Sequence, residues 1–457
     1  MFIDLNSIKK VIIVGLGYRT GLAAANFLSS RGFEVTVSDN KDEMQLAEII
    51  SQLANSVKVL TKHQDPKILD EGYDMLVLSP GVPKAIPLVQ HAIEKNIPVV
   101  SEIELASYYL KGTIIAITGT DGKSTTTSLT AHILKQLGVK TLMGGNIGIP
   151  LISLVDSSDE NTVSVVEVSS YQLETIHSFR PDVAAILNIS SDHLYRYPSM
   201  KEYFETKMRI TSNQTKDDFF VYNADDETIS SAISRVNAAK LSFSLKDENT
   251  DCFFNGEMIV NKNQSIDPSK MKIMGVHNIQ NEMAAFLIVK AALSKMKSEK
   301  NIVNEAFYSF VGLPHRMEYI GDFAGRKFVN DSKATTVGAV GMALKSFNGS
   351  CILIVGGRTM GDDYSKLAQY AKGRVRGVVI IGESSSYFAD IFSDFKYLIA
   401  DTLEDAVLKS LSLSLEGDTV LLSPACASFD MFESFEQRGD VFRSVYFKLV
   451  NGELKWI

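Results

Sequence analysis

The chain has 457 residues, of which 45% are hydrophobic and 22% are charged, and its formal net charge is −8. This composition is typical of a globular protein too long for one hydrophobic core, so two or three domains are expected. The negative charge excludes a general electrostatic attraction to nucleic acid or anionic lipid.

The amino-terminal apolar run is short and broken by glycine, unlike a signal peptide, and no apolar run is long enough for a membrane span. The three cysteines, Cys252, Cys351 and Cys426, are far apart in the chain. That spacing excludes a disulfide framework and a thiolate zinc site, and it indicates a reducing compartment. We therefore expect a cytoplasmic protein.

The first predicted strand, residues 11–14, leads into the glycine-rich turn GLGYRTG. Gly15, Gly17 and Gly21 nearly match the dinucleotide-binding fingerprint, with one residue more than usual, and Asp39 closes the next strand. Alone, this turn indicates a nucleotide diphosphate and does not decide between a nicotinamide cofactor and another nucleotide.

Short apolar runs ending in Gly, Ser or Asp alternate with helical patterns along the chain, in three separate sets. This alternation is typical of α/β domains with mostly parallel sheets. Residues 101–112 are predicted to form a connecting helix, and residues 242–270 polar hairpins or loop. We expect three α/β domains, with boundaries at 1–103, 104–311 and 312–457: a Rossmann-like domain, a central P-loop-type domain and a second Rossmann-like domain.

The stretch GTDGKST, residues 119–125, lies between a predicted strand and a predicted helix. Such a turn offers convergent backbone N–H groups at the positive end of a helix dipole, which suits phosphate. Lys123 is placed to reach the terminal phosphates and Ser124 to bind Mg²⁺. Only two residues separate Gly119 from Gly122, fewer than in the usual phosphate loop, so the alternative is a tight turn with a solvated lysine.

Several further motifs resemble those of the Mur ligase family and span all three predicted domains. They are GGNIG (144–148), VEVSSYQLE (166–174), NISSDHLYRYP (188–198), ETKMRI (205–210), GVHNIQN (275–281), GLPHRME (312–318), NDSKATT (330–336) and SPACASFDMFESFEQRGDVF (423–442). Within the family, the last three of these motifs, together with SSYQLE (169–174), are most similar to those of the enzyme that joins D-glutamate to UDP-N-acetylmuramoyl-L-alanine.

The resemblance implies an ATP-dependent ligase of peptidoglycan precursor synthesis, linked to cell shape and division. ATP would phosphorylate the alanyl carboxylate, and the D-glutamate amine would displace phosphate from the acyl phosphate. The implied cofactors are ATP and Mg²⁺ at two sites. The partners are these small molecules, with no nucleic acid or membrane, and the chain is expected to be a monomer.

The resemblance also implies roles for individual residues. ATP would be bound by Gly119, Thr120, Asp121, Gly122, Lys123, Ser124, Thr125, Asn278, Arg316, Asp331 and Lys333. Metal would be bound by Ser124, Glu167, His193 and Lys207, the last as an N-carboxylated side chain, and catalysis would rest on Lys123, Glu167, His193 and Lys207. The UDP-sugar would be bound by Gly17, Thr20, Asp39, Ser79, Gly81 and Asn146, and D-glutamate by Thr335, Arg358, Ser428 and Phe435. Arg316, at a hinge, would reach the ATP phosphates when the third domain closes.

Two positions depart from the family pattern. Tyr195 stands where an acid is usual, and Met360 stands where many relatives carry a lysine. We therefore expect Arg358 to bind the carboxylate of the amino acid, unless the substrate differs.

Ordinary structural roles remain the alternatives for single residues: a structural histidine for His193, a strand-end acid for Glu167, a helix cap for Asn278, a solvated lysine for Lys207, surface charges for Asp331 and Lys333, and a core ring for Phe435. Other whole-chain functions are a sibling ligase, a folylpolyglutamate synthetase, a nicotinamide-dependent dehydrogenase or a nucleotide sensor. The dehydrogenase would leave Lys123 and Ser124 without a role.

Overall fold

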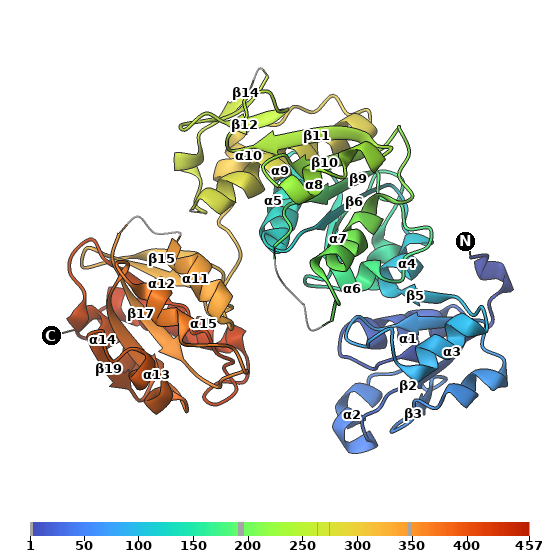
Figure 1. Ribbon diagram of the computed structural model, residues 1–457, viewed down its shortest axis with the longest axis horizontal. Coiled ribbons are helices and arrows are strands. Elements are labelled where there is room, and N and C mark those ends of the chain that lie inside the picture. Colours follow the sequence, from blue (N-terminus) through green and yellow to red (C-terminus); the bar gives the residue numbers. More distant parts are fainter. Residues whose placement is uncertain (1–2, 191–195, 263, 274, 346–348, 457) are drawn as a thin grey trace. The chain divides into compact units, whose positions relative to one another are not determined.

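The computed structural model describes residues 3–190, 196–262, 264–273, 275–345 and 349–456 (Figure 1). These residues form two compact units. One comprises Met1–Pro268 and Ile279–Phe307, and the other comprises Ser269–Asn278 and Tyr308–Ile457. The first unit covers the first predicted domain and most of the second, and the second unit covers the third together with residues 269–278 and 308–311.

The amino-terminal domain is a parallel sheet with the strand order β3-β2-β1-β4-β5. Its strands are β1 (Lys10–Val14), β2 (Glu34–Ser38), β3 (Lys58–Leu60), β4 (Met75–Leu78) and β5 (Val99–Ser101). Its helices are η1 (Leu5–Ser7), α1 (Thr20–Ser30), α2 (Glu43–Ile50), η2 (Pro66–Glu71) and α3 (Pro87–Glu94). Alternate residues of β1 enter different cores, Val11 and Ile13 on one face and Ile12 and Val14 on the other. The apolar run of the sequence is therefore a central strand buried on both faces.

The central domain has the strand order β14-β13-β12-β11-β10-β9-β6-β8-β7. Its strands are β6 (Thr113–Thr118), β7 (Thr141–Gly145), β8 (Val163–Glu167), β9 (Val183–Ile186), β10 (Phe219–Asn223), β11 (Ala239–Ser244), β12 (Cys252–Phe254), β13 (Ile259–Asn261) and β14 (Gln264–Ile266). Neighbouring strands from β7 to β12 are parallel, and β12, β13 and β14 are antiparallel hairpin strands. The predicted hairpins in residues 242–270 are confirmed.

Helices of the central region connect and cover these strands (Figure 1). They are α4 (Glu102–Ser107), α5 (Lys123–Gln136), η3 (Leu151–Ser157), α6 (Ser170–Leu173), α7 (Met200–Met208), η4 (Arg209–Thr211), α8 (Glu227–Ser230), η5 (Ile233–Arg235), η6 (Pro268–Lys270), α9 (Val276–Lys295) and α10 (Asn304–Tyr308). The predicted connecting helix corresponds to α4. Its buried Glu104 accepts backbone N–H groups of His177, Ser178 and Phe179 at 2.8–3.0 Å, which fixes α4 to the central domain.

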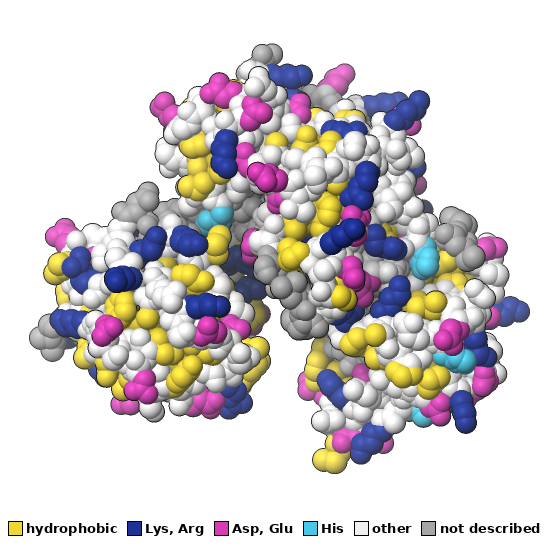
Figure 2. Space-filling model, in the orientation of Figure 1, with side chains coloured by type: hydrophobic (Ala, Val, Ile, Leu, Met, Phe, Trp, Pro, Cys, Tyr) yellow, Lys and Arg dark blue, Asp and Glu magenta, His cyan; other side chains and the backbone are white. Residues whose placement is uncertain are grey.

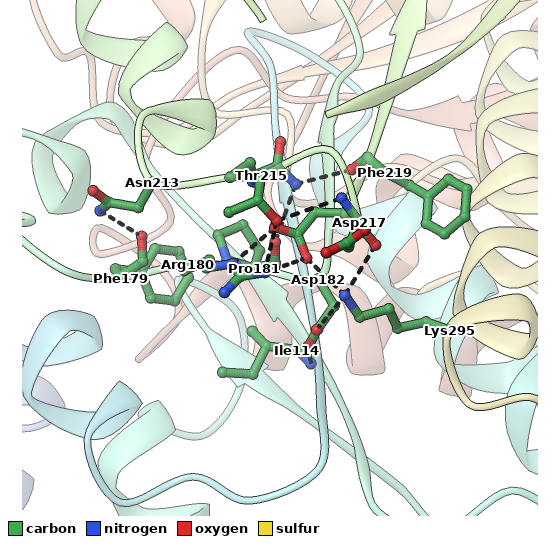
Figure 3. A network of polar contacts seen from close by, with 12 residues as sticks. Ile114, Phe179, Arg180, Pro181, Asp182, Asn213, Thr215, Asp217, Phe219 and Lys295 are labelled. Atoms are coloured by element: carbon green, nitrogen blue, oxygen red, sulfur yellow. Dashed lines mark hydrogen bonds and ion pairs between the residues drawn. The ribbon is translucent and has the colours of Figure 1, made fainter. Parts of the chain in front are cut away.

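A polar network lies where β6, β9 and β10 begin (Figure 3). Asp218, fully buried, accepts hydrogen bonds from Arg180 Nε at 2.8 Å and Lys295 Nζ at 2.7 Å. Lys295 also pairs with Asp182 at 3.2 Å, and Asp182 accepts the Ile114 N–H at 2.9 Å. The network joins three strands to the last turn of α9.

The second unit contains the sheet β15-β16-β20-β17-β18-β19, parallel except for the pair β15–β16. Its strands are β15 (Glu318–Phe323), β16 (Arg326–Asn330), β17 (Cys351–Gly356), β18 (Val375–Ile381), β19 (Tyr397–Ala400) and β20 (Thr419–Leu422). One core lies between the sheet and α11 (Val337–Lys345), α12 (Lys366–Ala371) and α13 (Ser385–Ile391), and the other between the sheet and α14 (Leu403–Leu413) and α15 (Phe435–Val450). The α/β class predicted from the sequence is confirmed.

No helix among the described residues is both long enough and apolar enough to cross a membrane. On the face shown in Figure 2, basic and acidic side chains are interspersed. This mixture agrees with the modest net charge of the chain.

Candidate active site

The predicted phosphate loop occupies the turn between β6 and α5. The Asp121 N–H donates to Asn188 Oδ1 at 2.8 Å, and the Thr120 N–H donates to the Asn188 carbonyl at 3.0 Å. Gly122 has φ +79°, and a Cβ there would overlap the side chain of Asn281. The loop therefore needs glycine at this position both for its backbone conformation and for space.

Two lysines converge on one carbonyl of this loop. Lys123 Nζ donates to the Gly119 oxygen at 2.9 Å and to the Thr120 oxygen at 2.7 Å. Lys207 Nζ, from α7, donates to the same Gly119 oxygen at 2.8 Å. Lys207 is 1% exposed and lies 4.7 Å from the centre of the Tyr203 ring. The alternative of a solvated helix lysine is wrong for Lys207.

Glu167 ends β8 directly opposite Ile117 of β6 and is 2% exposed. Its Oε1 accepts the Asn146 side-chain amide at 2.7 Å, and its carbonyl accepts the Asn146 N–H at 2.8 Å. Among the described residues, no group donates a hydrogen bond to its buried Oε2. A buried carboxylate oxygen of this kind is chemically suited to a cation.

Within the described part of the chain, no three His, Cys, Asp or Glu side chains are grouped to hold a metal. Mg²⁺ does not require such a group, because it commonly binds one or two carboxylates together with water and substrate phosphate. Glu167 and Ser124, which is 6% exposed at the start of α5, fit that pattern. His193 and Tyr195 lie outside the described residues.

Apart from Asn146, which follows β7 in the central domain, the predicted UDP-sugar residues lie after the carboxyl ends of β1, β2 and β4. Asp39 accepts the Leu16 N–H at 2.6 Å and the Lys41 N–H at 2.9 Å. Ser79 Oγ donates to the Gly15 carbonyl at 2.6 Å, joining the SPG turn to the first glycine-rich turn. Gly17 is exposed and Thr20 begins α1. A crevice ligand is expected at this edge of an open parallel sheet.

The remaining predicted ATP residues, Asn278, Arg316, Asp331 and Lys333, belong to the second unit. Asp331 is 5% exposed, and its carboxylate accepts Ser423 Oγ at 2.9 Å and the Met317 N–H at 3.1 Å. Burial raises the pKa of Asp331 to about 7, against the opposing effect of these hydrogen bonds. The alternative of a solvated surface charge is therefore wrong for Asp331.

The GLPHRME segment has an unusual backbone. His315 and Met317, on either side of Arg316, have φ values of +61° and +44°. Left-handed conformations are costly for residues other than glycine and often occur at functional sites. Asn278, at the start of α9, is buried and donates its backbone N–H to the Gly275 carbonyl at 2.8 Å.

The predicted D-glutamate residues lie on three loops and at the start of one helix of the second unit. Arg358 follows β17 and exchanges backbone hydrogen bonds with Ala427, the neighbour of buried Ser428. Phe435 starts α15, with its ring 5.5 Å from Lys333 Nζ. Thr335 is half-buried just before α11. Met360, at the position that departs from the family, is 63% exposed.

Three residues beside these sites had not been predicted. Tyr203 contacts both Lys207 and Thr120 Oγ1. Glu383 pairs with Arg358, and Arg19 joins the first glycine-rich turn to the GGNIG segment. Glu383 belongs to no motif, so no sequence signal indicated it, whereas Arg19 lies within a motif that was recognised.

Comparison with known proteins matches each part of the chain to a family model. The descriptions are Mur ligase MurD-like, N-terminal domain, for residues 9–101; Mur ligase middle domain, for residues 117–289; and Mur ligase, glutamate ligase domain, for residues 315–426. The three-domain prediction is confirmed, although the boundaries at 103/104 and 311/312 stay predictions.

Curated relatives extend over almost the whole chain. The UDP-N-acetylmuramoylalanine–D-glutamate ligase of Trichlorobacter lovleyi is 42% identical over 441 residues, which cover 95% of this chain and 97% of that protein. The protein of the same name from Geotalea daltonii is 41% identical, with coverage of 98% and 99%.

Solved structures show the same fold at lower identity. The UDP-N-acetylmuramate–alanine ligase MurC of Thermotoga maritima aligns with a TM-score of 0.59 at 19% identity, covering 96% of this chain and 99% of that one. The MurF ligase of Thermotoga maritima, solved with ADP, has a TM-score of 0.59 at 16% identity, with coverage of 99% and 97%. On the matched domains and these full-length relatives, the chain belongs to the Mur ligase family.

Proposed function

We propose that this chain joins D-glutamate to UDP-N-acetylmuramoyl-L-alanine at the expense of ATP, in peptidoglycan precursor synthesis. The observation that carries the proposal is that a phosphate loop lies beside the buried carboxylate of Glu167, which is suited to bind a cation. Glu167 lies opposite Ile117, two residues before the loop begins at Gly119. Relatives 41–42% identical over nearly the full chain bear the name of this ligase.

The chemistry follows from the poor reactivity of a carboxylate. Transfer of the γ-phosphoryl group of ATP to an alanyl carboxylate oxygen forms an acyl phosphate and ADP. The D-glutamate nitrogen then attacks the carbonyl carbon, the bond to the phosphate oxygen breaks, and the amine loses a proton as the amide forms. One ATP is converted to ADP and phosphate for each amide.

The chain's own residues supply positioning and charge. Lys123 Nζ, now bonded to loop carbonyls, would exchange them for phosphate oxygens and stabilise the charge on the transferred group. The backbone N–H groups at the start of α5 would hold the phosphates. Mg²⁺, held by Ser124 and Glu167, would neutralise phosphate charge. His193 is proposed as a further ligand.

Lys207 is proposed to act as a carbamate. Two ammonium groups bonded to one carbonyl oxygen repel each other, and a buried ammonium has lost most of its hydration. Addition of CO₂ to the neutral amine forms an N–C bond, releases one proton and leaves an anion. The repulsion with Lys123 becomes attraction, and the carbamate oxygens gain the capacity to bind a second Mg²⁺.

In the second unit, Arg316, Asp331 and Lys333 are proposed to contact ATP, and Thr335, Arg358, Ser428 and Phe435 to contact D-glutamate. The chain is proposed to act as a monomer in the cytoplasm. These assignments rest on the family motifs quoted for the sequence.

The proposal is tested by phosphate release from ATP with each component omitted in turn. Release is expected only when UDP-N-acetylmuramoyl-L-alanine, D-glutamate and Mg²⁺ are all present, with an amide product of matching amount. Turnover of NADH, or no ATP hydrolysis with any UDP-sugar and amino-acid pair, would contradict the proposal.

A further inference from the structure

Arg19 connects two parts of the first unit that are far apart in sequence. It is the N-cap residue of α1, in the proposed UDP-sugar turn, yet its guanidinium extends to the central domain. There it donates to the Gly145 carbonyl at 3.1 Å and to the Asn146 carbonyl at 3.3 Å. The contact joins the nucleotide turn to the GGNIG segment.

The contacted segment in turn holds Glu167. Asn146 bonds to Glu167 twice, from its side-chain amide to Oε1 at 2.7 Å and from its N–H to the Glu167 carbonyl at 2.8 Å. Hydrogen bonds therefore lead from the turn that would bind diphosphate, through Asn146, to the buried carboxylate of Glu167 beside the phosphate loop.

The other end of the same segment is also fixed. Glu102, at the start of α4, accepts the Ile152 N–H at 2.6 Å. Residues 145–152 are thus held between Arg19 and Glu102. A segment fixed at both ends transmits a displacement at one end more directly than a free loop does.

We propose that Arg19 is a positioning residue that couples diphosphate binding at the GLGYRTG turn to the orientation of Glu167. The inference rests on the proposed function, because it takes the turn as the diphosphate site. A guanidinium has five N–H donors, and bonds to a phosphate are roughly twice as strong as bonds to neutral groups. Bound diphosphate would therefore fix Arg19, and Arg19 would fix the backbone that carries Asn146.

The test compares Arg19→Gln with Arg31→Gln as the matched control. Arg31 joins the same two domains in a different way, through an ion pair with Asp156 of η3, and its hydrogen bond and ring contacts involve neither Gly145 nor Asn146. For each enzyme one measures the KM for the UDP-sugar, the Mg²⁺ concentration giving half-maximal rate, and the calorimetric binding of UDP alone without metal.

Arg19→Gln is expected to raise the KM for the UDP-sugar and the half-maximal Mg²⁺ concentration, each by about 10-fold, and to weaken UDP binding. Arg31→Gln is expected to leave all three within about 2-fold, as surface ion pairs are weak. In an Asn146→Ala background, the effect of Arg19→Gln on Mg²⁺ should disappear while its effect on UDP remains.

An active wild-type enzyme whose Arg19→Gln variant keeps its Mg²⁺ dependence would overturn the coupling. The coupling would also be overturned if Arg19→Gln raised the half-maximal Mg²⁺ concentration equally in the Asn146→Ala background. The same holds if Arg31→Gln raised that concentration as much as Arg19→Gln does. If Arg19→Gln lowered the melting temperature without these kinetic changes, Arg19 would only stabilise the contact between the two domains. Wild-type protein inactive with any UDP-sugar would instead refute the proposed function.

Discussion

The guanidinium of Arg358 and the carboxylate of Glu383 form a bidentate ion pair, with Nε 2.9 Å from Oε1 and Nη2 3.2 Å from Oε2. Arg358 follows β17 and Glu383 follows β18, which is the adjacent parallel strand. Both side chains are about half exposed, at 52% and 47%. The arginine proposed to hold the substrate carboxylate therefore already binds a carboxylate of the chain itself.

Arg358→Ala is expected to raise the KM for D-glutamate and to leave the KM for ATP nearly unchanged. The loss of one charge-assisted hydrogen bond costs about 1.5–3 kcal/mol of binding, or roughly 10–100-fold in affinity. Steady-state kinetics with each substrate varied in turn measure both constants. An unaltered KM for D-glutamate would return Arg358 to an ordinary surface role.

Glu383→Gln is expected to lower the KM for D-glutamate, because it removes the internal competitor for Arg358. Lys448→Gln is the matched control, since it breaks the similarly exposed pair with Glu404 at 2.9 Å on other elements of the unit. A raised KM in Glu383→Gln would mean that the pair positions Arg358 and does not compete with the substrate.

Glu102 is expected to make the stability of the first unit depend on pH. Burial raises the pKa of Glu102 from 4.5 to about 7, against the Ile152 N–H and the charge of Arg19. The folded chain therefore binds this proton more tightly than the unfolded chain. The stability contributed by protonated Glu102 falls as pH rises from about 4.5 to about 7, and it is constant above that range.

Glu102→Gln should abolish this pH-dependent contribution to stability. The difference in unfolding free energy between wild type and variant should therefore change by on the order of 1–3 kcal/mol between about pH 4.5 and pH 7. Urea unfolding at several pH values measures it. Asp331, whose pKa is also raised, is present in both proteins, so its contribution cancels when the variant is subtracted from wild type. Exposed Glu160→Gln is the control, and a pH-independent difference for Glu102→Gln would contradict the prediction.

The sequence was most informative where one local rule determines the structure. The strands before Gly15 and Gly119 were evident because apolar runs buried on both faces end at glycine turns. The phosphate loop was predictable because its donors are the backbone of adjacent residues. Short edge strands such as β3 and β5 were missed, since three residues leave almost no periodic signal.

Local sequence patterns could not predict which residues become buried or which distant residues come into contact. Nothing in the helix around Lys207 indicates that its lysine is 1% exposed. Arg358 and Glu383 are far apart in the chain and become neighbours only because β17 and β18 pair. The side-chain roles at these sites remain predictions based on the family motifs.

Asp218→Asn is expected to destabilise the first unit by about 2–4 kcal/mol, because it removes the shared anion of Arg180 and Lys295 (Figure 3). Burial opposes ionisation, but these hydrogen bonds and the Thr215 N–H outweigh it and lower the pKa of Asp218 to about 2. The stability that Asp218 contributes is therefore present above about pH 4 and is lost as pH falls toward 2.

Urea unfolding combined with amide hydrogen exchange in β9 and β10 measures the effect in this unit. Exposed Asp217→Asn is the neighbouring control and should stay within about 0.5 kcal/mol. Equal stability of Asp218→Asn and wild type at pH 7 would show that the ion network contributes nothing net. A gap between them that did not narrow toward pH 2 would contradict the charge-based explanation.

The last prediction concerns Lys207, whose Nζ shares the Gly119 carbonyl with Lys123. If Lys207 is carbamylated, Lys207→Ala should lose most activity and regain part of it with acetate, because a free carboxylate replaces the missing anion. Lys207→Arg should not be rescued, since its guanidinium keeps a positive charge in the same buried position. Lys201→Ala, on the exposed side of α7, is the control and should keep wild-type turnover.

Mass spectrometry of rapidly trapped protein should find one added CO₂ on Lys207, and both this CO₂ and the activity should be lost in CO₂-depleted buffer. Wild-type turnover by Lys207→Ala in that buffer would show that the lysine serves only the packing of α7 against the phosphate loop.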